Sequence, residues 1–252
     1  MEMFAQHNSI VRRIWGSSDT ILFIFAGAAA EFALNKAVDW LYFTGKLPAD
    51  PLGRLFSTVS YARKIVFAEK DDAHKSIDTI YHIHKSVEQS RGDVIPDWAY
   101  RDVLFMLIHY SIASFELLER KLFDDEKEEV YNVFYRVGNR MQLKDLPETY
   151  VEWLPVREQH LHNDLKKSNY TDDLFLQYKK HLGSFRYIVL VEAQIKVMPQ
   201  HVKNLLQLNR RSYLPVALYK LSKKMRLDAL VKKLLLPSAY QKQIAALDVV
   251  PK

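Results

Sequence analysis

The chain has 252 residues, of which 48% are hydrophobic and 26% are charged, a balance that is typical of a globular protein and excludes an intrinsically disordered one. It has no cysteine, which excludes disulfides, thiolate zinc sites, iron–sulfur clusters and cysteine nucleophiles. The net charge of +6 is unevenly distributed. Residues 203–252 contain eleven Lys or Arg against two Asp, a net charge of +9, which leaves −3 for residues 1–202.

Only 7 glycines and 9 prolines interrupt long runs rich in Leu, Ala, Lys and Glu. Such a pattern predicts an all-α fold, a single globular domain of nine or ten helices. The segment 186–191 has a strand-like composition, but one strand without a partner does not make a sheet. The expected helices cover about 20–43, 54–67, 72–89, 98–123, 124–141, 146–160, 171–183, 186–197 and 200–236.

The apolar run Ile21–Ala30 in the first long helix is interrupted by Glu31. A bilayer span needs about 20 apolar residues, so this helix is expected to be buried in protein. The N-terminus lacks the basic start, apolar stretch and small-residue cleavage site of a secretory signal. A cytoplasmic location is therefore the expectation.

Small residues precede Glu31 in the same helix, at Gly27–Ala30. They allow close approach of either a second helix or a flat macrocycle. Glu31 stands where the pattern wants an apolar residue. A buried carboxylate either has a chemical task or pairs with a core arginine, and both alternatives remain open.

His84 lies on the apolar stripe of the helix 72–89, in register with Ile77, Ile80 and Val87. Burying an imidazole without partners costs about 1–3 kcal/mol, so its nitrogens need partners. In a chain without cysteine, such a histidine points to a metal ion or a haem iron, or else to a hydrogen bond with a backbone carbonyl. His82, two residues earlier, faces another side of the helix.

Three further residues are candidates for the same site. Arg54 and Thr58 are one turn apart, so they share a helical face, where Arg54 could bind an anion or pair with Asp50. His109 lies in the helix expected to be most buried, as a second ligand, a pocket residue or a core side chain. His160 and His162 are two residues apart, which is not ligand spacing on a helix.

The C-terminal segment alternates apolar and basic residues, from Leu218 and Lys220 to Lys233 and Leu234. It could contact an anionic membrane or cover the core with its lysines in water. Nucleic acid is not expected, because no aromatic residues are interleaved with the charges. The sequence also lacks a phosphate loop, a Gly-x-Ser-x-Gly elbow, a His-Glu-x-x-His motif and a dinucleotide fingerprint.

The order of these motifs resembles the MpaB-type oxygenases and rubber oxygenases (latex-clearing proteins) of bacteria and fungi. The resemblance spans about residues 9–215. It rests on Asp50-Pro-Leu-Gly-Arg-Leu-Phe-Ser-Thr58, His84-x-x-Val87 after twenty-six residues, His109, Gly138, Leu146-Pro-x-x-Tyr150 and Leu182-Gly-Ser-Phe-Arg-Tyr187.

The resemblance implies a globin-reminiscent helical domain over residues 1–215 that holds haem b, with the basic helix and tail 216–252 packed on it. It implies His84 as the iron ligand, with Arg54, Thr58 and His109 as further haem-site residues. Arg54, Thr58 and Glu31 are the implied catalytic residues. The implied reaction is oxidation of an apolar, isoprenoid or lipid-like substrate by dioxygen.

The chain departs from this family in two places. Ser57 stands where rubber oxygenases have a Lys, and Ala30-Glu31 where many members have His-Pro. Two alternatives therefore stay open: a non-catalytic haem sensor or carrier, and a haem-free helical lipid-binding protein. The sequence leaves the oligomeric state undefined.

Overall fold

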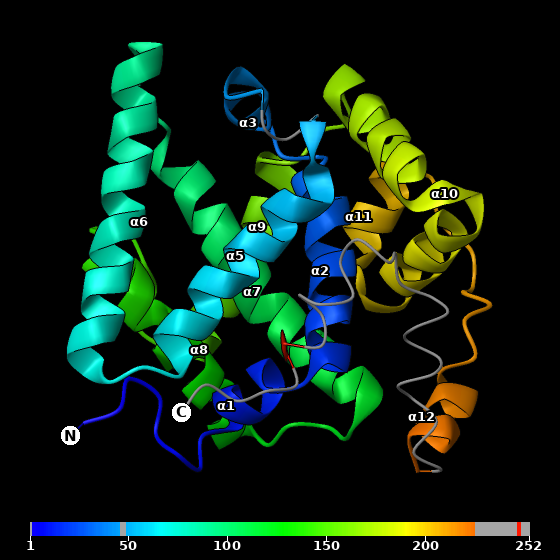
Figure 1. Cartoon of the computed structure of the whole chain (residues 1–252), viewed down its shortest axis with the longest axis horizontal. Helices are drawn as coiled ribbons and strands as arrows, with labels where there is room; N and C mark the ends of the chain where they lie inside the picture. The colour runs from blue at the N-terminus through cyan, green and yellow to red at the C-terminus, as the bar shows by residue number, and fades with distance from the viewer. Residues whose placement is uncertain (1, 46–48, 225–245, 248–252) are drawn as a thin grey trace.

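The structure is a computed structural model that describes residues 2–45, 49–224 and 246–247. Within these ranges the chain is all-α, as predicted, with eleven helices and no β-structure beyond two isolated bridges (Figure 1). The helices are α1 (Ile10–Trp15), α2 (Ser18–Phe32), α3 (Asp39–Phe43), α5 (Pro51–Val66), α6 (Lys70–Arg91), α7 (Asp97–Leu118), α8 (Asp124–Arg140), α9 (Tyr150–Asn163), α10 (Asn169–Val197), α11 (Gln200–Leu205) and α12 (Val216–Lys224).

The core is built around α2 and α7, which form the most extensive helix pair and lie near the centre of Figure 1. Gly27 permits this approach, because a Cβ at that position would overlap the ring of Tyr110. The small residues of α2 therefore admit a second helix on this side. α10 packs on another side of α2, and α5 pairs with α6.

The single helix predicted over 20–43 is instead divided into α2 and α3. The chain leaves the helix because its backbone pairs with the segment after α9. Lys166 N donates to Leu34 O at 2.7 Å, and Lys36 N donates to Asp164 O at 3.0 Å. Such pairing competes directly with continued helical hydrogen bonds.

Two other boundaries differ from the prediction. α5 begins at Pro51, where proline is favoured in the first turn, and Asp50 caps it by accepting from Gly53 N at 2.8 Å. The helices expected over 171–183 and 186–197 form one element, α10, kinked at Gly183 with φ 74° and ψ 163°.

The predicted C-terminal helix is described only in part. α11 and α12 cover two pieces of the range 200–236, and residues 225–236 lie outside the described residues. Most of the proposed membrane-contacting segment therefore also lies outside them. In the part of the chain that is described, no helix combines the length and apolar character needed to cross a bilayer.

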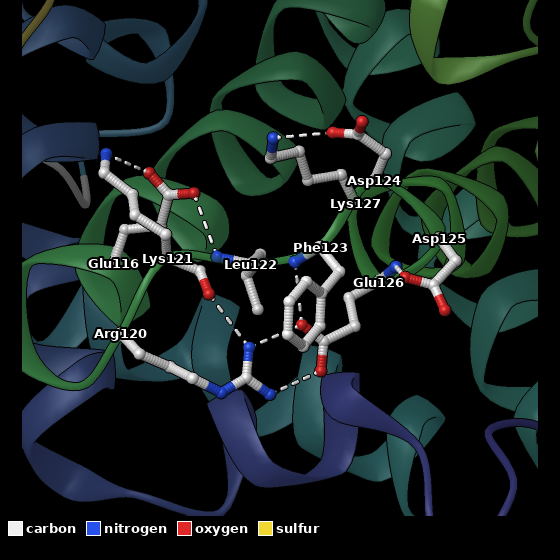
Figure 2. Close-up of polar contacts among 9 residues, drawn as sticks. All are labelled: Glu116, Arg120, Lys121, Leu122, Phe123, Asp124, Asp125, Glu126 and Lys127. Carbon is white, nitrogen blue, oxygen red and sulfur yellow. Dashed lines mark hydrogen bonds and ion pairs between the residues drawn. The ribbon is translucent and has the colours of Figure 1, made fainter.

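The turn between α7 and α8 is held by ion pairs and backbone hydrogen bonds (Figure 2). Glu116 accepts from Leu122 N at 3.1 Å, while Glu126 accepts from Phe123 N at 2.9 Å and pairs with Arg120 at 2.6 Å. These contacts satisfy amides that would otherwise be free at the helix ends. As a result α7 ends about one turn earlier than predicted.

Candidate functional site

Arg54 and Thr58 meet on one face of α5, as their spacing predicts. The Arg54 guanidinium donates to Thr58 Oγ1 at 3.0 Å, and that hydroxyl donates to the Arg54 carbonyl at 3.3 Å. Burial lowers the pKa of Arg54, although not enough to discharge a guanidinium. Within the described residues Arg54 has no carboxylate in ion-pair contact, and Asp50 serves as a helix cap instead. A partly buried cation without an acid partner is suited to binding an anionic group.

His84 lies on α6, close enough to α5 to be affected by Arg54. Burial lowers the pKa of His84, and the positive charge of Arg54 lowers it further. The carbonyl of Ile80 is near the ring, but Nδ1 is buried without a well-aligned hydrogen bond to any described residue. The imidazole is therefore neutral at physiological pH, which is the form that binds metals.

The His84 ring is held in place by α7. Tyr100 packs edge-on against it, with ring centroids 5.2 Å apart, and donates its hydroxyl to Glu88 at 3.0 Å. Glu88 also accepts from Ile95 N at 3.1 Å and pairs with Lys85 at 2.8 Å. These contacts restrict the orientation of the imidazole in a way that suits a metal ligand.

Glu31 lies in a different cluster, the buried ion network, which joins α2, α7 and α9. Its carboxylate is fully buried, pairs with Arg157 at 2.6 Å and accepts from the Tyr110 hydroxyl at 2.8 Å. The sequence left open whether Glu31 has a chemical task or pairs with a core arginine, and the structure shows the pairing with Arg157. Burial alone would lower the pKa of Arg157, but the charge and hydrogen bond of Glu31 outweigh burial and raise that pKa.

The same network continues to His160, which lies between two carboxylates. Its Nε2 is 2.5 Å from Asp102 and its Nδ1 is 2.5 Å from Asp164. Asn35 donates to the second oxygen of Asp102. Burial would lower the pKa of His160, but the hydrogen bond and charge of Asp102 outweigh burial and raise it. These contacts favour the protonated form of His160, whose positive charge compensates the buried acids.

His109 is near this network rather than near His84. Burial lowers its pKa to about 4, the charge of Arg157 adds to this, and the Val197 carbonyl is a hydrogen-bond acceptor for the ring. His109 and Tyr100 are nine residues apart on α7, about 180° around the helix. Because Tyr100 packs on His84, His84 and His109 lie on opposite sides of α7.

The structure thus divides the predicted residues into two groups. Arg54, Thr58 and His84 come together between α5 and α6, whereas Glu31 and His109 lie around the buried ion network. Their assigned roles remain predictions.

The sequence analysis missed Asp102, Arg157 and His160 as members of that network. Two signals could have found them. Asp102 interrupts an apolar helix, and Arg157 and His160 are three residues apart on one face of α9.

The donors near His84 bear on the kind of metal group that would fit. In the described part of the chain, no three His, Asp or Glu side chains converge into a metal site. A metal at His84 would then need its other ligands from a macrocycle, as in haem, where one histidine suffices. The neutral imidazole of His84 fits a haem, and so does Arg54, which has no carboxylate partner among residues 2–45, 49–224 and 246–247 and could pair with acidic propionates.

The helical fold and this histidine–arginine pair are consistent with an all-α oxygenase catalytic domain. Residues 12–223 match the family described as "ER-bound oxygenase mpaB/B'/Rubber oxygenase, catalytic domain". This match covers most of the 252 residues, and the chain belongs to this family. In the other two comparisons, no curated protein and no solved structure matches the chain with significant similarity.

Proposed function

We propose that the chain is a haem b-dependent oxygenase that uses dioxygen to oxidise an apolar, isoprenoid or lipid-like substrate. Family membership supports an oxygenase. The haem assignment rests on one observation: a neutral, oriented His84 beside an Arg54–Thr58 pair that makes no ion pair with any carboxylate among the described residues. Haem would supply the redox chemistry that amino-acid side chains lack.

The side chains around the haem would have distinct tasks. His84 would hold the iron through Nε2, and Tyr100 would keep its ring from rotating. Arg54 would pair with a propionate or with negative charge that develops on the oxygen substrate, and Thr58 would hold the guanidinium in place.

Glu31 is assigned a positioning task in this proposal. Its carboxylate already accepts hydrogen bonds from Arg157 and Tyr110, which tie α2 to α9 and α7. Both contacts use Oε2, whereas Oε1 is buried without a hydrogen-bond partner in the described part of the chain. Glu31 belongs to the buried ion network and not to the group between α5 and α6, so the proton acceptor for a substrate bound near His84 is expected elsewhere.

The test measures dioxygen uptake and carbonyl products from a polyisoprenoid by the haem-loaded chain. Wild type and His82→Ala should be active, because His82 is exposed and on another face of α6. His84→Ala should lose activity by at least about 100-fold, as expected for loss of a metal ligand.

Other outcomes would identify the alternatives. Reversible dioxygen binding without product would favour a haem sensor or carrier. A colourless protein that binds anionic vesicles would favour the haem-free lipid-binding alternative. Equal activity in His84→Ala and wild type would refute the ligand assignment.

A further inference from the structure

A pocket of about 310 Å³ lies between α7, α9 and the start of α11. It is large enough for a small ligand. α9 and α11 are in contact with each other, which closes one side. Most of its wall is apolar, formed by Ile112, Ala113, Trp153, Leu154, Leu161 and Pro199.

Three polar residues of the wall have unused hydrogen-bonding capacity. The buried nitrogens His109 Nε2, Trp153 Nε1 and Arg157 Nε have no hydrogen-bond partner in the described part of the chain. Trp153 and Arg157 have N–H groups that need acceptors. A buried polar group left unpaired costs about 1–3 kcal/mol, so a ligand that pairs with these groups would be stabilised.

His109 adds the opposite requirement. With its pKa lowered to about 4 by burial, the ring is neutral and carries one proton, for which the Val197 carbonyl is an acceptor. The other ring nitrogen is then an acceptor that needs a donor. A ligand that satisfies Trp153 or Arg157 must accept a hydrogen bond, and one that satisfies His109 must donate one. A hydroxyl group can do both.

The charges around the pocket disfavour an anion. Arg157 is already neutralised by Glu31 at 2.6 Å and is 3.7 Å from Asp102. Two further carboxylates, Glu116 and Glu158, belong to the wall. A fatty acid would bring another negative charge to them.

We propose that this pocket is a second binding site, for a neutral molecule that has a hydroxyl group on an apolar body. The hydroxyl would donate to His109 and accept from Trp153 or Arg157, and the body would lie along the apolar wall. His109 is about 180° around α7 from Tyr100, and Tyr100 packs on His84. This site is therefore independent of the haem proposed at His84.

The probe is decanol, compared with decane and decanoate, each titrated into the isolated full-length chain. Binding is followed by calorimetry and by the indole N–H signal of Trp153, assigned with Trp153→Phe. Decanol should bind at least about tenfold more tightly than either other probe, because only it meets both hydrogen-bonding requirements. Equal or tighter binding of decane or decanoate would overturn the proposal.

Variants test the location. Leu154→Trp fills the pocket from a position that is 45% exposed, so the fold should tolerate it, and decanol binding should be lost. His109→Phe should weaken binding about tenfold, while His109→Gln, which retains an acceptor, should recover part of it. Unchanged binding in Leu154→Trp would refute the site even if the His109 variants did not fold. His84→Ala should bind decanol as wild type does, and loss there would contradict the independence of the two sites.

Discussion

His160 is buried and His84 is half-buried, and the protein changes their pKa values in opposite directions. Burial lowers the pKa of His84, and the nearby positive charge of Arg54 lowers it further. His160 is between Asp102 and Asp164, so its pKa rises. His84 is kept in the neutral form that can act as a ligand, whereas the protonated form of His160 is favoured and both of its ring nitrogens already face carboxylates. Burial alone would have made them alike, so the neighbouring charges decide which one can serve a cofactor.

The largest expected effect comes from breaking the buried ion network. Arg157→Met should lower the free energy of unfolding by about 3–5 kcal/mol, because it leaves Glu31 buried without its cation, while Asp102 keeps only His160. Arg54→Met should lower it by about 1 kcal/mol or less, because no carboxylate that the structure describes would lose its cation. Denaturant unfolding measures both, and equal costs would show that the two regions do not differ as described.

The pH dependence of stability should have opposite signs at the two histidines. The raised pKa of His160 gives stability that is present below pH 6.5 and is lost as pH rises through its folded-state pKa. The lowered pKa of His84 gives stability that is present above pH 6.5 and is lost as pH falls through its folded-state pKa. Unfolding at several pH values should show the first dependence vanish in His160→Asn and the second in His84→Asn. If both variants lost the same dependence, the assigned charges would be incorrect.

The smallest effect is expected in the exposed turn after α7 (Figure 2). Glu126→Gln should lower the free energy of unfolding by about 1 kcal/mol or less, since solvent screens its pair with Arg120. The hydrogen bond from Arg120 lowers the pKa of Glu126 to about 2, so this contribution is lost as pH falls from 4.5 towards that value. If Glu126→Gln lowered the free energy of unfolding as much as Arg157→Met does, the expected difference between exposed and buried ion pairs would be contradicted.

Local patterns were sufficient to predict the helical class, the shared helical face of Arg54 and Thr58 and the position of His84 on the helix face that carries Ile77. Each of these depends on residues within a few turns of the same helix. The family was also predicted from the order of motifs and is confirmed by the match over residues 12–223.

Long-range contacts explain what was not predicted. α2 ends early because residues 34–36 pair with residues 164–166, far away in the sequence. His160 was considered only for its spacing from His162, whereas in the structure it is buried beside Asp102 of another helix, which helps to raise its pKa. No periodicity along α9 contains that information, since the partner is on α7.

The central claim is that His84 is neutral, half-buried and able to bind iron. The most direct test is haem titration of wild type, His82→Ala and His84→Gly, with Soret absorbance and bound iron measured together. Wild type and His82→Ala should bind haem with the same Soret band, and His84→Gly should lose that band and regain it on addition of imidazole. An unaltered Soret band and iron content in His84→Gly without imidazole would contradict the account.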